Sequence, residues 1–186
     1  WIAKGPRFPA GITNVVVKKG VEPKGNVRIT YFTREPIEEL DQHRANTAAS
    51  ILNDHLRSSL RELLGGTYSP SARFGSQAPL PGYSTMAVSF GCDPAREDTM
   101  VSTTLAEIRK LVENGPSTED VAKEQEVQRR ELETSMKQNG YWLGSLQTVQ
   151  MLGWDPLRIN ARAQRIDLLT PENLHETFKK YFPADH

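Results

Sequence analysis

The fold is decided by residues 60–69, which read Leu60-Arg61-Glu62-Leu63-Leu64-Gly65-Gly66-Thr67-Tyr68-Ser69. The residues before this stretch have the apolar spacing of a long helix, and those after it have the pattern of a strand. Gly65 and Gly66 predict the end of the helix, because glycine adopts a left-handed backbone without steric penalty. The reversal can bring the guanidinium of Arg61 beside the phenol of Tyr68. Such donors suit a backbone carbonyl on which negative charge develops.

Four short segments have the composition of strands. Residues 13–18 hold three consecutive valines, and residues 26–33 alternate apolar with polar side chains, so we expect these two to form a hairpin or neighbouring pair. Residues 67–74 follow the two glycines. The fourth strand is marked by the alternation of Met86, Val88 and Phe90 with Ala87 and Ser89.

The long helix is predicted to open at Pro36 and to bury an apolar stripe of Ala45, Ala48, Ala49, Leu52, Leu56, Leu60 and Leu63. Four more helices follow. One begins at Asp93-Pro94 and closes at Gly115, one begins at Ser117 with Asp120 in a capping box and reaches about Lys137, and the others cover residues 141–152 and 170–182.

This order, strands first and helices last, predicts an α+β fold with an antiparallel sheet and helices packed on one face. We expect residues 1–186 to form one domain. Tyr141 and Trp142 are expected in the core between a helix and the sheet. No Gly-x-Gly-x-x-Gly follows any predicted strand, which disfavours a dinucleotide-binding fold.

Composition restricts the function. The 186 residues carry 23 basic and 23 acidic side chains, so the basic surface that nucleic acid requires is not expected. The apolar runs are far shorter than the roughly 20 residues of a membrane span. Because the chain opens at Trp1, we expect it to be a piece of a longer protein.

The histidines do not predict a metal site of this chain's own. His43, His55 and His175 each lack a second histidine at helical spacing, so we interpret them as surface or packing residues. Cys92, the only cysteine, has no neighbouring base and is expected to be a packed thiol at a strand end.

Two further features have a functional and a structural interpretation. Glu38, Glu39 and Asp41 could bind a cation, but the positive N-terminus of a helix already favours them, and we prefer that explanation. Arg61 could simply pair with Glu62 or Asp54, with Tyr68 packed on the sheet.

An ordered set of motifs, however, resembles the pitrilysin/insulinase family of zinc metallopeptidases (inverzincins), and in particular its second, C-terminal, non-zinc half. The fold that this implies is that of a mitochondrial processing peptidase half. The matching stretches cover nearly the whole chain and are Lys19-Gly20-Val21-Glu22-Pro23-Lys24, Leu60-Arg61-Glu62 through Gly65 and Thr67-Tyr68-Ser69, Asn139-Gly140-Tyr141-Trp142-Leu143, Thr170-Pro171-Glu172-Asn173-Leu174, and Lys179-Lys180-Tyr181-Phe182.

The resemblance implies a split active site that acts on unstructured peptides. Zinc would be held by His-x-x-Glu-His and a distal glutamate in a partner half, a motif that this chain lacks. By position, Tyr68 would donate its hydroxyl to the scissile carbonyl oxygen, and Arg61 would hold a substrate backbone carbonyl. The bacterial members suggest a periplasmic location.

Two alternatives remain open from the sequence. The same fold serves as a non-catalytic scaffold in some family members, and an unrelated α+β binding domain would use Arg61 and Tyr68 only structurally. A family half would also continue into another strand beyond His186.

Overall fold

A computed structural model describes residues 11–21, 24–33, 38–60, 70–76 and 83–183. Its sheet contains three antiparallel strands in the order β1-β3-β2: β1 (Gly25–Thr33), β2 (Ser71–Ser76) and β3 (Ser84–Cys92). In the register, Val27 faces Phe90 across the β1 and β3 pair, and Ala72 faces Val88 across the β2 and β3 pair. β3 is therefore the central strand, and its buried positions alternate as the sequence predicts.

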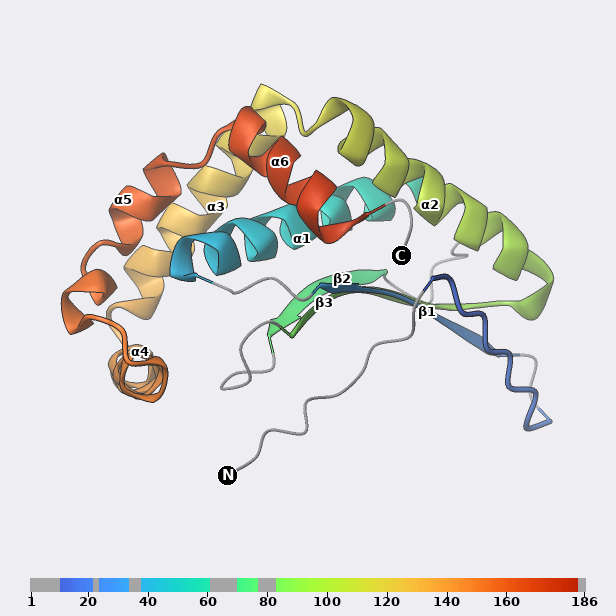
Figure 1. The fold of residues 1–186 in the computed structure, drawn as a ribbon, viewed down its shortest axis with the longest axis horizontal. Helices are drawn as coiled ribbons and strands as arrows, with labels where there is room; N and C mark the ends of the chain where they lie inside the picture. The colour runs from blue at the N-terminus through green and yellow to red at the C-terminus, as the bar shows by residue number, and fades with distance from the viewer. Residues whose placement is uncertain (1–10, 22–23, 34–37, 61–69, 77–82, 184–186) are drawn as a thin grey trace.

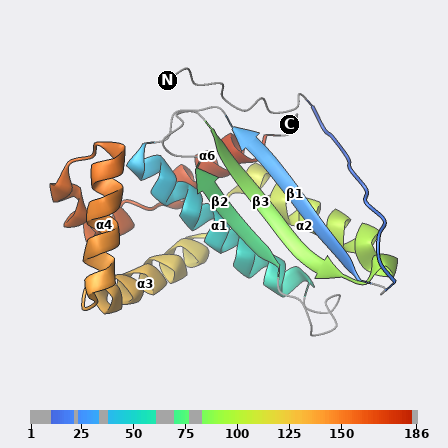
Figure 2. The same ribbon diagram turned by 90° about the horizontal axis from the view of Figure 1, so that it is seen from below.

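Three helices cover one face of this sheet, as Figures 1 and 2 show from two sides: α1 (Glu39–Leu60), α2 (Glu97–Asn114) and α6 (Pro171–Tyr181). The predicted apolar stripe of α1 is buried from Ala45 to Leu60, and its last predicted member, Leu63, lies outside the described residues. It packs in one core with Met86 and Val88 of β3 and Phe178 of α6. The predicted α+β architecture, with helices on one sheet face, is confirmed.

The remaining helices extend beyond the end of the sheet (Figure 2). They are α3 (Thr118–Ser135), α4 (Asn139–Leu152) and α5 (Arg162–Asp167), with the 3₁₀ turn η2 (Pro156–Ile159) between the last two. Ser117 and Asp120 form the predicted capping box, because the side chain of each accepts a hydrogen bond from the backbone N–H of the other. Asp93 caps a short 3₁₀ turn, η1 (Pro94–Arg96), from which α2 continues.

The strand predicted at residues 13–18 is wrong. These residues form no strand, and Val15, Val16 and Val17 are 74–81% exposed. The predicted hairpin with residues 26–33 is wrong for the same reason, and the strand that pairs with β1 is β3. Strand propensity expresses packing against neighbouring strands, and no described strand pairs with the three valines.

The predicted core position of Tyr141 and Trp142 is also wrong. Both lie on α4, which is remote from the sheet, and Trp142 is 36% exposed while Leu143 is 61% exposed. The two rings contact each other edge to face, and the indole N–H of Trp142 donates to the Met136 carbonyl. The break between α3 and α4 at Gln138 turns α4 away from the core.

Some helix and strand ends differ from the prediction, and others lie outside the described residues. α1 begins at Glu39 rather than at Pro36, and the predicted end at Gly65-Gly66 lies outside the described residues. Within the part of residues 67–74 that is described, β2 begins at Ser71. In the described part of the chain, no helix combines the length and apolarity that crossing a bilayer requires.

Candidate functional site

The connection that carries Arg61 and Tyr68 lies outside the described residues, but both of its ends are described. Leu60, the last residue of α1, is fully buried, and Pro70 before β2 is buried too. The side chain of Asn53 on α1 donates to the Ala72 carbonyl on β2 at 2.9 Å and accepts from the Ala72 N–H. α1 and β2 are therefore fixed against each other where the connection joins them.

Asp54, one of the structural partners considered for Arg61, has cationic partners among the described residues. Lys123 on α3 approaches its carboxylate to 2.6 Å, and Arg57 on the same helix lies 3.6 Å away.

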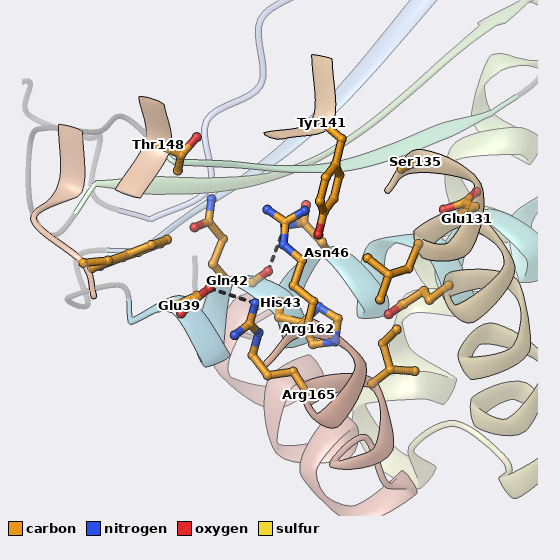
Figure 3. A pocket seen from close by; sticks show the side chains of 14 residues that line it. Glu39, Gln42, His43, Asn46, Glu131, Ser135, Tyr141, Thr148, Arg162 and Arg165 are labelled. Carbon is orange, nitrogen blue, oxygen red and sulfur yellow. Dashed lines mark hydrogen bonds and ion pairs between the residues drawn. The ribbon is translucent and has the colours of Figure 1, made fainter. Parts of the chain in front are cut away.

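A second candidate site lies at the other end of α1. A pocket of about 400 Å³ opens between the first turns of α1, the end of α3, α4 and α5 (Figure 3). Its walls include Glu39 and His43 from α1, Tyr141 from α4, and Arg162 and Arg165 from α5. We call this the arginine pocket.

Glu39 is the carboxylate of the arginine pocket that is held in ion pairs. Its side chain is only 13% exposed and lies 3.0 Å from Arg165 and 2.8 Å from Arg158 of η2. Asp41, in the same helical turn, pairs with Lys180 of α6 at 3.0 Å. The predicted acidic first turn is therefore present and binds cations of this chain itself.

The pKa of His43 is affected by burial and by the positive charges of the arginine pocket. Burial, together with the positive charges of Arg165, Arg162 and Arg44, lowers the pKa of His43 from 6.5 to about 4. Its Nε2 is buried and has no hydrogen-bond partner among the described residues. At neutral pH the imidazole is uncharged and keeps one unused polar atom.

The two arginines of α5 are held differently. Burial lowers the pKa of Arg165, an effect that Glu39 opposes. The Arg162 guanidinium lies 4.9 Å from the centre of the Tyr141 ring, and Figure 3 shows it rising from α5 into the pocket beside that ring. The arginine pocket therefore combines concentrated positive charge with an aromatic wall.

The other predicted candidates have structural partners. His55 lies 3.1 Å from Asp120 and 3.8 Å from Glu107, which joins α1 to α3 and α2. His175 contacts the Val112 carbonyl at 2.9 Å. Cys92 is a buried free thiol at the end of β3, as predicted, and burial raises its pKa.

Residues 11–21, 24–33, 38–60, 70–76 and 83–183 contain no group of three or more histidine, cysteine, aspartate or glutamate side chains that could hold a metal ion. The donor set of the described residues therefore does not fit zinc.

Sequence reasoning missed the arginine pocket. The short helix α5 was not predicted, so Arg162 and Arg165 had no assigned position. A signal existed, because Arg158, Arg162 and Arg165 recur at helical spacing. The pocket lies far from Leu60 at the other end of α1, since the helical rise from His43 to Leu60 is roughly 26 Å.

Comparison with known proteins places these features in context. A sequence model described as the peptidase M16 inactive domain matches residues 2–127. A zinc protease PQQL-like protein of Arabidopsis thaliana is 40% identical over 58 residues, which are 31% of this chain and 6% of that protein.

Solved structures are similar over most of the chain. The periplasmic protease PqqL of Escherichia coli has a TM-score of 0.79 at 21% identity, covering 92% of this chain and 19% of that one. A peptidase M16 inactive domain of Pseudomonas fluorescens has a TM-score of 0.74 at 16% identity, covering 88% of this chain and 39% of that one. At these identities the likeness shows the fold, and the chain spans a small part of these relatives.

Proposed function

Because this chain belongs to the peptidase M16 inactive-domain family, we propose that it is the non-zinc domain of a zinc-dependent metalloendopeptidase. In this proposal residues 1–186 form one α+β unit that binds the substrate backbone and stabilises the transition state, while a partner half holds zinc. The name zinc protease, carried by a relative, supports the proposal. Membership of the family excludes an unrelated α+β binding domain.

One observation carries the assignment of residues. The segment with Arg61 and Tyr68 falls inside the matched residues 2–127 and joins two elements that are fixed against each other. Arg61 directly follows the buried Leu60, and Tyr68 comes two residues before the buried Pro70. A connection held at both ends restricts where its side chains can reach, which is what positioning a substrate requires.

We assign Tyr68 to the scissile peptide bond and Arg61 to the backbone beside it. The Tyr68 hydroxyl donates a hydrogen bond to the carbonyl oxygen as negative charge builds on it, and Arg61 donates to a neighbouring carbonyl. One such donor in a desolvated cleft stabilises the transition state by roughly 3 kcal/mol. No step assigned to this chain passes through the metal, because its described residues do not fit zinc.

The test is hydrolysis of an unstructured fluorogenic peptide by the full protein that carries this chain. Tyr68→Phe is expected to lower kcat by about a hundredfold without lowering the melting temperature. Arg61→Gln is expected to weaken substrate binding. Arg57→Gln is the matched control, because Arg57 lies in the last turn of α1, four residues before Arg61 in the sequence, and is 63% exposed. A chelator is expected to abolish hydrolysis.

Unchanged turnover in Tyr68→Phe would remove the catalytic assignment. A full protein that binds peptide without hydrolysing it would instead support the second candidate, a non-catalytic scaffold or substrate-binding domain. The family description as an inactive domain applies to both candidates. For the location we propose the bacterial periplasm, supported by the similarity to a periplasmic protease.

A further inference from the structure

We propose that the arginine pocket binds a carboxylate carried on an apolar group, namely the C-terminal residue of a peptide, with Arg162 as the main contact to the carboxylate. The choice of a peptide as the carrier rests on the function proposed above. The binding site itself rests on the charges, the unused polar atoms and the lining of the pocket.

The first argument is an excess of positive charge. Arg158 and Arg165 share one carboxylate, Glu39, so two guanidinium groups face a single negative charge. Arg162 adds a third guanidinium. Among the described residues it has no hydrogen bond or ion pair, and it contacts the ring of Tyr141. Since a guanidinium has five N–H donors and suits a carboxylate in a two-point contact, Arg162 retains the capacity to bind an anion.

The second argument is the state of the groups around Arg162. His43 stays uncharged at neutral pH and its buried Nε2 is unused, so it can donate a hydrogen bond to an anion in one tautomer. Gln42 and Asn46 also line the pocket from the first turns of α1, whose positive end favours a negative ligand. Two carboxylates line the pocket: Glu39 is paired with Arg158 and Arg165, and Glu131 of α3 opposes this preference.

The third argument is the apolar part of the lining. Leu132, Ile166, Tyr141 and Trp154 contribute walls beside the polar groups. The volume of about 400 Å³ lies within the usual range of small-ligand sites, roughly 300–1,000 Å³. An inorganic anion would leave these walls unoccupied, whereas a carboxylate on an apolar side chain uses both kinds of contact.

The site is separate from the proposed catalytic connection. His43 and Leu60 are separated along α1 by roughly 26 Å of helical rise. A peptide end held in the arginine pocket would therefore anchor the substrate at a distance of several residues from the bond that is cut, since an extended chain spans about 3.3 Å per residue.

The test is calorimetric titration of the full protein that carries this chain, treated with chelator so that no turnover occurs. The probes are N-acetyl-leucine, its uncharged amide N-acetyl-leucinamide, and inorganic phosphate. We expect N-acetyl-leucine to bind about tenfold more tightly than the amide, because the charge-assisted contacts are lost with the carboxylate. We also expect it to bind more tightly than phosphate, and to shift the NMR signals of the His43 ring.

Variants locate the site. Arg162→Gln is expected to lower the affinity for N-acetyl-leucine about tenfold, and Arg162→Lys is expected to lower it less. Arg129→Gln is the matched control, because Arg129 forms an exposed ion pair with Asp167 of α5 and does not line the pocket. It is expected to leave the affinity unchanged.

Equal binding of the acid and its amide to the wild-type protein would overturn the proposal without any variant, so it stays testable if Arg162→Gln does not fold. Undiminished binding in a folded Arg162→Gln variant would overturn it as well. Tighter binding of phosphate than of N-acetyl-leucine would overturn the assignment to a peptide end. None of these results depends on hydrolysis, so they are distinguishable from a failure of the roles proposed for Arg61 and Tyr68.

Discussion

Replacing Gly115 by alanine is expected to destabilise the fold strongly, for two reasons that the structure separates. Gly115 ends α2 with φ 74° and ψ 175°, a backbone region essentially restricted to glycine. An added Cβ would lie 2.9 Å from both Cβ and Cγ of His175 on α6. His175 cannot easily withdraw, because its Nε2 contacts the Val112 carbonyl at 2.9 Å.

The magnitude follows from these two costs. The backbone conformation costs about 1–3 kcal/mol for a non-glycine residue, and forcing a methyl group into a packed contact costs a further 1–3 kcal/mol or so. We therefore expect Gly115→Ala to lower the free energy of unfolding by about 4 kcal/mol.

Two other glycines provide controls. Gly153 ends α4 in the left-handed region with φ 67°, and nothing lies within 4 Å of an added Cβ, so Gly153→Ala is expected to cost only about 1–2 kcal/mol. Gly144 lies inside α4, in open space and without a positive φ. Gly144→Ala is expected to stabilise the helix by about 0.5–1 kcal/mol.

The assay is equilibrium unfolding in urea followed by circular dichroism, with the midpoint and slope compared across the three variants. Adding His175→Ala to Gly115→Ala is expected to remove part of the destabilisation, because the close contact with the His175 Cγ disappears while the contact with its Cβ remains. A Gly115→Ala variant that unfolds at the same urea concentration as Gly153→Ala would refute the clash with His175.

Two further outcomes are expected. Asn53→Ala removes both hydrogen bonds to Ala72 and is expected to lower the free energy of unfolding by about 1–3 kcal/mol in the same urea assay; no loss would contradict the tie between α1 and β2. His43 has a folded pKa of about 4 against 6.5 unfolded, so its contribution to stability is complete above pH 6.5 and is lost as pH falls towards 4. His43→Gln should lose less stability than wild type between pH 7 and pH 4, and equal losses would contradict the lowered pKa.

The sequence predicted best those elements whose pattern is local. The alternation of Met86, Val88 and Phe90 fixed which face of β3 is buried, and helix periodicity did the same for α1. Ser117 with Asp120, and Thr170 before Pro171, predicted helix starts because capping depends on residues within one turn.

Features that depend on distant partners were not predictable in the same way. Val15, Val16 and Val17 have the composition of a strand, but no described strand pairs with them and they are exposed. The aromatic residues of α4 have the composition of a core helix. The break at Gln138, which directs α4 away from the sheet, leaves Trp142 partly exposed.

The candidate sites divide in the same manner. The Arg61 and Tyr68 pair was predicted from the order of motifs along the chain, and it stays a prediction. The arginine pocket was missed because it needs Glu39 and Arg165, which are far apart in sequence and 3.0 Å apart in the fold.

The most direct test of the central claim is a crystal structure of the full protein, depleted of zinc, with an uncleaved peptide bound. We expect the Tyr68 hydroxyl to lie within about 2.5–3.0 Å of the scissile carbonyl oxygen, with Arg61 donating to a neighbouring backbone carbonyl. A bound peptide that neither Tyr68 nor Arg61 contacts would contradict the role that we assign to this domain.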